Sequence, residues 1–269
     1  MKSEKSLILS KFSASRGNKG VIAAAVLVYL FLYLPLAVVV IFSFNDSRLN
    51  AEWVGFTLDW YHKLFNNRDM LQAAGNSVLI ACISALMASV LGTLAGMAIH
   101  RFRQKWLSAL VLGPVAMPDI LIGVSLLLMF MLLNVTLGTV SIILAHVSFC
   151  IGFVALAVQA RMAGMDDSLI EAARDLGASP WQSFRLITLP LLLPGIIAGG
   201  LMAFTLSIDD FVITFFTAGV GSSTLPLEIY SMVKIAVTPE VNAVSTLLML
   251  LTLVLILAIS RISPQALRN

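Results

Sequence analysis

Residues 171–190 read EAARDLGASPWQSFRLITLP, a polar segment that separates two long apolar stretches. Ser168, three residues before Glu171, fits the capping box that begins many helices: the serine oxygen accepts the Glu171 amide, and the carboxylate accepts the serine amide. Gly177 suits the left-handed residue that ends a helix, because glycine adopts a positive φ without steric penalty. The sequence therefore predicts a short helix from Ser168 to Leu176 that ends at a bend.

A second short helix is predicted directly after this bend. Ser179 is placed to cap it, Pro180 fits the first helical position, and Gln182 completes another capping box. Pro190 is expected to end the segment where the next apolar stretch begins.

The two predicted helices present different surfaces. The first has small residues at Ala172 and Ala173, and the second presents Trp181, Phe184 and Ile187, which is more apolar surface than a solvated loop needs. Two interpretations follow from the residues alone. The segment is an amphipathic elbow that rests on the membrane surface, or it is a docking surface for a soluble partner.

The composition indicates a membrane protein. The chain is 59% hydrophobic and 12% charged, against about 45–50% and about 25% in soluble domains. A transmembrane helix needs about 20 predominantly apolar residues, and the first candidate lacks a signal-peptide cleavage site, so it is expected to be retained. Six candidate spans lie at about 21–44, 76–99, 107–133, 138–160, 189–217 and 241–260.

One membrane domain is therefore expected over 21–262, with tails at 1–20 and 263–269 and the elbow at 166–188. Lysine and arginine concentrate in the short loops on one side of this arrangement, which the positive-inside rule places in the cytoplasm. Both termini and the elbow are predicted to lie on that side.

Two spans have features that bear on helix packing. Pro114 and Pro118 both fall in the third span and predict a distorted helix, a candidate for lining a path. The second span has small residues at every fourth position, which let another helix approach closely, either in this chain or in a partner subunit. These residues are Ser84, Ala88, Gly92 and Gly96.

Three carboxylates, Asp119, Asp209 and Asp210, fall inside predicted spans. Charges within a membrane are costly and usually face a protein interior or water. Asp210 belongs to a polar stripe along one face of the fifth predicted helix, whereas Asp209 is turned about 100° away. The other members of the stripe are Ser207, Thr214 and Thr217.

Two interpretations of these carboxylates remain open. Asp210 lies on a cation path or gate, or it forms an interhelical ion pair or hydrogen bond. We expect no basic residue deep within a span to pair with it, and we expect His146 to be a hydrogen-bonded core residue. The outer loops at 45–75 and 218–240 carry more acidic than basic residues, which favours a cationic ligand.

The chain lacks the residue patterns of an enzyme. It has no phosphate-binding loop, so ATP hydrolysis would belong to another chain. His62, His100 and His146 lie in unrelated segments, and Cys82 and Cys150 fall inside apolar spans where no disulfide framework is expected. We expect no catalytic residue, no metal site and no cofactor in this chain.

The elbow resembles the signature loop of membrane permeases in bacterial ATP-binding-cassette importers. The residues that match this loop are Glu171, Ala172, Ala173, Gly177, Ile187, Leu189 and Pro190. The resemblance implies coupling helices that seat in a groove of a cytoplasmic ATPase. Glu171 would contact the groove, Ala172 and Ala173 would permit close approach, and Gly177 would set the bend. Trp181 and Phe184 would belong to the same surface.

Other stretches resemble the second permease subunit of spermidine/putrescine importers. Position 119 is often glutamate in that group, so Asp119 keeps an acid there. The matching stretches are Ser43-Phe44-Asn45, Gly55-Phe56-Thr57-Leu58, Met117-Pro118-Asp119, Ser207-Ile208-Asp209-Asp210-Phe211, Leu225-Pro226-Leu227-Glu228-Ile229-Tyr230-Ser231 and Pro239-Glu240-Val241-Asn242-Ala243.

The resemblance implies an all-α, polytopic bacterial inner-membrane protein with six transmembrane helices and the type I permease fold. The expected partners are an ATPase dimer that binds ATP and magnesium, a second and homologous permease, and an extracytoplasmic substrate-binding protein. Asp210, Asp209, Asp119, Ser207 and Thr214 would line the substrate pathway. The alternatives are import of another solute, an ion-gradient transporter that uses Asp209 or Asp210 as a relay, and a structural or sensory membrane protein.

Overall fold

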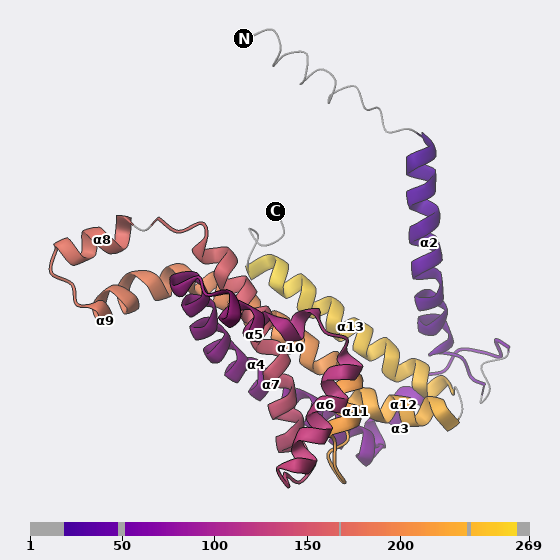
Figure 1. Ribbon diagram of the computed structural model, residues 1–269. Coiled ribbons are helices and arrows are strands. Elements are labelled where there is room, and N and C mark those ends of the chain that lie inside the picture. The colour runs from indigo at the N-terminus through magenta and orange to yellow at the C-terminus, as the bar shows by residue number, and fades with distance from the viewer. Residues whose placement is uncertain (1–18, 48–51, 167, 236–237, 263–269) are drawn as a thin grey trace.

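The computed structural model describes residues 19–47, 52–166, 168–235 and 238–262, so the predicted tails at 1–20 and 263–269 lie almost entirely outside it. Helices dominate the described residues (Figure 1), and the contact between extended segments is an isolated bridge from Asn45 to Phe56. The helices are α2 (Lys19–Phe42), α3 (Asp59–Asn66), α4 (Arg68–Phe102), α5 (Lys105–Ala116), α6 (Asp119–Leu132), α7 (Thr139–Met162), α8 (Ser168–Asp175), α9 (Pro180–Ser183), a π-helix (Phe184–Thr188), α10 (Leu189–Asp209), α11 (Val212–Thr217), α12 (Leu225–Ile235) and α13 (Pro239–Ile262).

The packed centre consists of α4, α7 and α10, whose contacts bury small and β-branched side chains. One close approach involves Gly92 of α4: a Cβ there would lie 2.6 Å from Val154 Cβ and 2.9 Å from the Ile151 carbonyl oxygen of α7. The small-residue stripe of the second predicted span therefore packs within this chain. That is the first of the two interpretations offered by the sequence.

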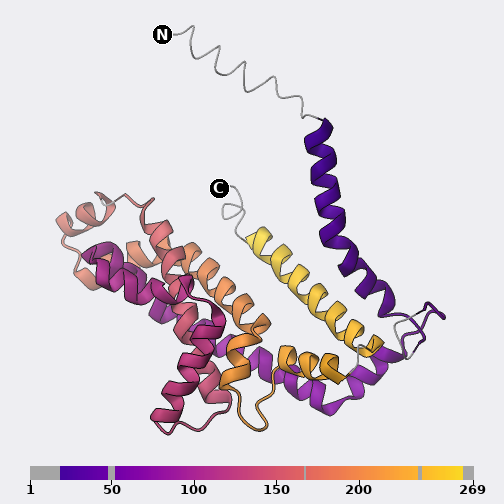
Figure 2. The same cartoon turned by 45° about the vertical axis from the view of Figure 1, so that its right-hand side comes forward.

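Helix α2 stands apart from this centre in both views (Figures 1 and 2). Its apolar side chains are exposed around most of the helix, Phe31 to 80%. A helix that is hydrophobic all round requires an apolar environment, so this one needs lipid or another protein chain around it.

Two predicted spans are broken. The third, expected as one helix over 107–133, divides into α5 and α6. The chain bends by 110° between these two helices, around Met117 and Pro118. The proline removes a backbone donor and disfavours the helical conformation of the residue before it. The fifth, expected over 189–217, ends as α10 at Asp209 and resumes as α11 at Val212. The distortion expected at Pro118 is confirmed, whereas the prediction of one continuous helix was wrong at the break after Asp209.

Four helices of the described residues are long and apolar enough to cross a membrane, namely α2, α4, α7 and the run Pro180–Asp209. The bent pair α5 and α6 makes a fifth candidate if it counts as one span. In α13 the described apolar run is shorter, from Pro239 to Val254.

The segment before α4 forms a structured unit that the sequence did not predict. Trp60 of α3 is buried and donates a hydrogen bond from Nε1 to the Asn45 carbonyl oxygen at 2.8 Å. Asn67 caps α4, its Oδ1 accepting the amides of Asp69 and Met70. These contacts start α4 at Arg68, before the apolar run that begins near residue 76.

Candidate functional site

The elbow between α7 and α10 extends away from the packed centre as α8 and α9 (Figure 1). Gly177 has φ 83°, the left-handed conformation expected from the sequence, and its amide donates to the Arg174 carbonyl oxygen at 2.9 Å. The Ala178 amide donates to the Ala173 carbonyl oxygen at 3.0 Å. These bonds close the end of α8 in the way that a glycine C-cap does, and the predicted bend is confirmed.

The beginning of α8 differs from the prediction. Ser168 is already the first helical residue, and its amide donates to Asp166 Oδ1 at 3.0 Å. The hydroxyl and amide of Ser168 together hold the pKa of the exposed Asp166 carboxyl below its ordinary value of 3.8. At this end of α8 the structure thus places the acceptor on Asp166 and not on Ser168.

The second capping box is confirmed. The Gln182 amide donates to Ser179 Oγ, and the Ser179 amide donates to Gln182 Oε1, with Pro180 at the first helical position. The segment does not end at Pro190, however. A π-helix follows α9, and the Leu189 amide donates to the Phe184 carbonyl oxygen. This wide turn precedes the proline, so the chain stays helical into α10.

The elbow exposes most of the residues that resemble a coupling surface. Glu171 and Ala172 are exposed, Ala173 is partly buried, and Trp181 is 66% exposed. The ring of Trp181 lies 5.6 Å from that of Phe184, centroid to centroid. Within the described part of the chain, Glu171 has no hydrogen-bond or ion-pair partner, so its carboxylate is available to another molecule.

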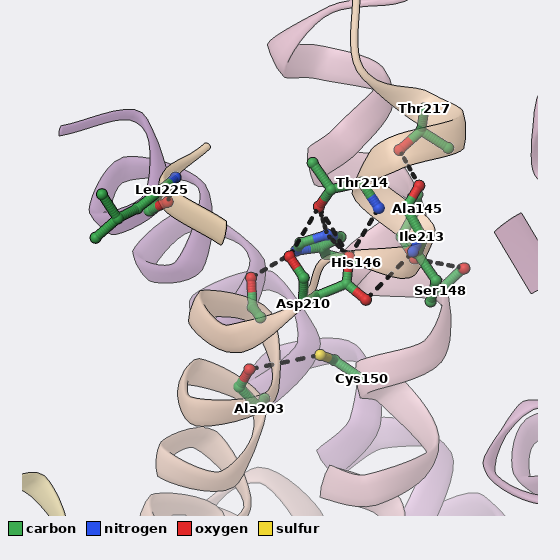
Figure 3. Close-up of polar contacts among 12 residues, drawn as sticks. Ala145, His146, Ser148, Cys150, Ala203, Asp210, Ile213, Thr214, Thr217 and Leu225 are labelled. Atoms are coloured by element: carbon green, nitrogen blue, oxygen red, sulfur yellow. Dashed lines mark hydrogen bonds and ion pairs between the residues drawn. The ribbon is translucent and has the colours of Figure 1, made fainter. Parts of the chain in front are cut away.

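A second polar cluster lies inside the packed centre, around His146 of α7 (Figure 3). This side chain is fully buried. Its Nδ1 lies 2.7 Å from Ser207 Oγ of α10, and its Nε2 lies 3.0 Å from Thr214 Oγ1 of α11 and 3.2 Å from Asp210 Oδ2. The expectation of a hydrogen-bonded core histidine is confirmed. The expectation that no basic residue would pair with a membrane carboxylate is wrong for Asp210.

Asp210 occupies the break between α10 and α11 in an extended conformation. Its carboxylate accepts the amides of Ile213 and Thr214 at 3.3 and 2.7 Å, and the Thr214 hydroxyl at 2.8 Å. It therefore caps the first turn of α11 while it contacts His146. An ionised carboxylate only accepts hydrogen bonds, so a hydrogen bond between an ionised Asp210 and His146 would have Nε2 as its donor.

The predicted polar stripe is thus not one helix face. Ser207 and Thr214 lie on separate helices and meet at His146 from either side of the break. Thr217 lies apart from them: its hydroxyl donates to the Ile213 carbonyl oxygen, and its own carbonyl accepts the Ser141 hydroxyl. A buried imidazole needs polar partners, and that requirement is the signal in the sequence that could have linked His146 to Asp210.

The other two carboxylates have a different environment. Asp209 is exposed at the end of α10, and Asp119 is exposed in the first turn of α6. Neither has a hydrogen-bond or ion-pair partner among the residues that the structure describes. No group of three or more His, Cys, Asp or Glu side chains in those residues could hold a metal ion.

The sequence pattern of the family described as "Binding-protein-dependent transport system inner membrane component" matches residues 88–268. The chain therefore belongs to this family of permease subunits and is a multi-pass membrane protein. It is 43% identical over 234 residues to the spermidine/putrescine transport system permease protein PotC of Escherichia coli, covering 86% of this chain and 89% of the relative. It is 42% identical over 231 residues to the putrescine transport system permease protein PotI of the same organism, covering 82% of each.

A solved structure shares the fold. It is the crystal structure of a bacterial ABC transporter involved in the import of the acidic polysaccharide alginate, with a TM-score of 0.73 at 16% identity, covering 97% of this chain and 99% of that one. At this identity the likeness concerns the fold alone. The all-helical architecture is therefore that of an ABC importer permease.

Proposed function

We propose that this chain is one of two permease subunits in an ATP-driven importer of polyamines such as spermidine and putrescine. The observation that carries the proposal is the 43% identity to a spermidine/putrescine permease across 86% of the chain. Supporting evidence comes from the exposed carboxylates at Asp209 and Asp119, because a polyamine is a flexible polycation.

The proposed membrane arrangement has six spans. They are α2, α4, the bent pair α5 and α6, α7, the run from α9 to α11, and α13. The concentration of basic residues in the loops that contain Arg101 and Arg174 supports a cytoplasmic location for those loops, the elbow and both termini.

The elbow is proposed to couple this chain to a separate cytoplasmic ATPase dimer, which would bind ATP and magnesium. Glu171 offers an exposed carboxylate on α8 beside the small, exposed Ala172, and Trp181 and Phe184 offer an apolar surface on the next segment. The chain itself is proposed to be non-catalytic and without a cofactor. It would contribute contacts with ATPase and substrate that differ between inward-open and outward-open states.

The five proposed pathway residues divide into two groups by geometry. Asp209 and Asp119, which have no described partner, are proposed to face the substrate. Asp210, Ser207 and Thr214 already bond to His146, so we propose that they border the path and fix the break between α10 and α11. A homologous second permease would close the cavity, and an extracytoplasmic binding protein would deliver substrate to it.

The buried contact between His146 and Asp210 also supports a second candidate, an ion-gradient transporter in which these residues relay a proton. Uptake of labelled spermidine into proteoliposomes separates the two. Uptake that requires the co-purified ATPase and ATP, with no imposed gradient, supports the importer. Uptake driven by a proton or sodium gradient without ATP would favour the relay, and ATP-driven uptake of a different solute would correct the substrate alone.

A further inference from the structure

A groove of about 690 Å³ lies where the elbow passes the end of α4. Basic side chains line it from two elements: His100, Arg101 and Arg103 from the end of α4 and the residue after it, and Arg174 from α8. No acidic residue lines the groove. The side chains of these four residues make no hydrogen bond or ion pair with any residue that the structure describes. The groove is therefore a positively charged site whose charges are not neutralised by the described chain.

The remainder of the lining is apolar except for Ser183 and Thr188. Met97 and Met162 contribute apolar surface from α4 and α7, and Phe184 contributes it from the elbow. Ser183 also lines the groove; it is 3% exposed, and its Oγ has no hydrogen-bond partner among the described residues. A buried hydroxyl without a partner is uncommon, and an acceptor oxygen in the groove would satisfy it.

A simpler explanation accounts for part of this charge. His100 and Arg101 lie in the last turn of α4, where cations are favourable beside the helix C-terminus. Arg174 likewise lies in the last turn of α8, so the explanation covers each of these residues singly but not the convergence of two helix ends on one groove. Arg103 is the residue that directly follows α4, at φ 51°, a conformation that residues other than glycine seldom adopt. The end of α4 and the end of α8 thus both bring positively charged side chains to the same groove.

We propose that this groove binds the phosphodiester headgroup of an anionic phospholipid in the leaflet next to the elbow. The cationic groups match the phosphate of a lipid headgroup, and the apolar side chains beside them match its acyl chains. A free phosphate has no apolar part that could contact those side chains. The exposed Trp106 lies three residues beyond Arg103, and tryptophan is enriched at the level of lipid headgroups. The inference rests on the membrane location of the chain and goes beyond the transport proposal.

The test compares two double variants that remove the same charge. Arg103→Gln/Arg174→Gln takes one charge from each side of the groove. Lys105→Gln/Arg185→Gln takes one charge from α5 and one from the elbow, at positions that do not line it. Each variant is purified with its co-purifying subunits, and retention of dioleoylphosphatidylglycerol against dioleoylphosphatidylcholine is measured by native mass spectrometry over a lipid titration.

We expect the unmodified protein to retain phosphatidylglycerol in preference to phosphatidylcholine. The groove variant should bind the anionic lipid about tenfold or more weakly, since each basic side chain near an anionic surface adds on the order of 1 kcal/mol to binding. The control variant should bind it as the unmodified protein does. Inorganic phosphate, added as a competitor in millimolar excess, should leave the lipid bound.

Four results would overturn the inference. Equal retention of the two lipids by the unmodified protein, or equal losses in both variants, would show that the groove has no lipid preference. Displacement by phosphate would assign it to a soluble anion. A cross-link from Arg103→Cys to another subunit would make it a protein interface. A complex that retains the lipid but imports no polyamine would contradict the transport proposal and leave the lipid site in place.

Discussion

His146 and Asp210 are in direct contact inside the packed centre, with 3.2 Å between Nε2 and Oδ2. The two residues come from α7 and from the break between α10 and α11, so this contact joins an unbroken helix to a broken one (Figure 3). Ser207 and Thr214 bond to the same imidazole from the two sides of the break. One buried side chain therefore contacts both sides of the break between α10 and α11.

Replacing the imidazole should loosen this arrangement. His146→Leu leaves the Asp210 carboxylate, Ser207 and Thr214 without one partner each, and a buried polar group that loses its partner costs about 1–3 kcal/mol. We expect a lower melting temperature of the purified complex and a smaller loss for His146→Gln, which keeps a donor. Ser148→Ala on the same helix removes only a bond to the Ala145 carbonyl oxygen and serves as the control. Equal melting temperatures for His146→Leu and Ser148→Ala would contradict the assigned role.

The neighbouring carboxylates should differ in what they affect. Asp209→Asn removes an exposed charge without a described partner, so we expect normal amounts of protein and a raised KM for spermidine uptake. Asp210→Asn weakens the cap of α11 and the contact with His146, so we expect a lower yield of folded complex. Uptake is measured over a range of spermidine concentrations and divided by the amount of complex in the membrane. This separates a change in KM from a change in the yield of folded complex. An unchanged KM in Asp209→Asn would remove that residue from the pathway.

The close approach of α4 and α7 predicts opposite effects for two glycines of one helix. Gly92→Ala places a Cβ 2.6 Å from Val154 Cβ, and overpacking of this kind typically costs about 1–3 kcal/mol. Gly75→Ala meets nothing within 4 Å, and alanine favours a helix interior over glycine by roughly 0.5–1 kcal/mol. Thermal unfolding of the two variants should therefore move in opposite directions. A shared direction would mean that the α4–α7 contact is looser than the structure shows.

The elbow residues should affect coupling more than folding. At φ 83° the Gly177 backbone strains any residue with a Cβ, so Gly177→Asp should displace α8 relative to α9. Glu171→Lys reverses an exposed charge. We expect both variants to reach the membrane in normal amounts and to lose ATP-dependent uptake or its link to ATP hydrolysis. Gly164→Ala, where a Cβ would lie 3.8 Å from the nearest atom, is the control. Transport at the unmodified rate in both elbow variants would contradict a coupling role.

Local features of the fold were predictable where one residue type determines the backbone. Gly177, the Ser179 capping box and the distortion at Pro118 all follow from side-chain or backbone chemistry within a few positions. The break after Asp209 was missed, because Asp209 and Asp210 were placed on one continuous helix. It depends on a carboxylate that caps α11 and on an imidazole from another helix, and a single sequence does not show tertiary contacts of this kind.

Pro190 shows the opposite error. Read locally, a proline ends a helix, yet here the π-helix before it widens the backbone and the helical run continues. The wider turn involves five residues, Phe184–Thr188. None of these residue types by itself indicates a π-helix. The grouping of the candidate residues was not predictable, since the polar stripe was read as one helix face and the structure divides it between α10 and α11.

The helical run Pro180–Asp209 has 30 residues, a length of roughly 45 Å at 1.5 Å per residue. The elbow lies at one end of this run and Asp209 at the other. A movement of the helix at one end would therefore be transmitted to the other end. Coupling between two sites is reciprocal in free energy. If ATPase binding at the elbow changes the affinity for substrate beside Asp209, then substrate bound there must change the affinity for the ATPase by the same free energy. The environment of Trp181 would then depend on whether substrate is bound near Asp209. Its fluorescence should therefore change when spermidine is added in the absence of ATP.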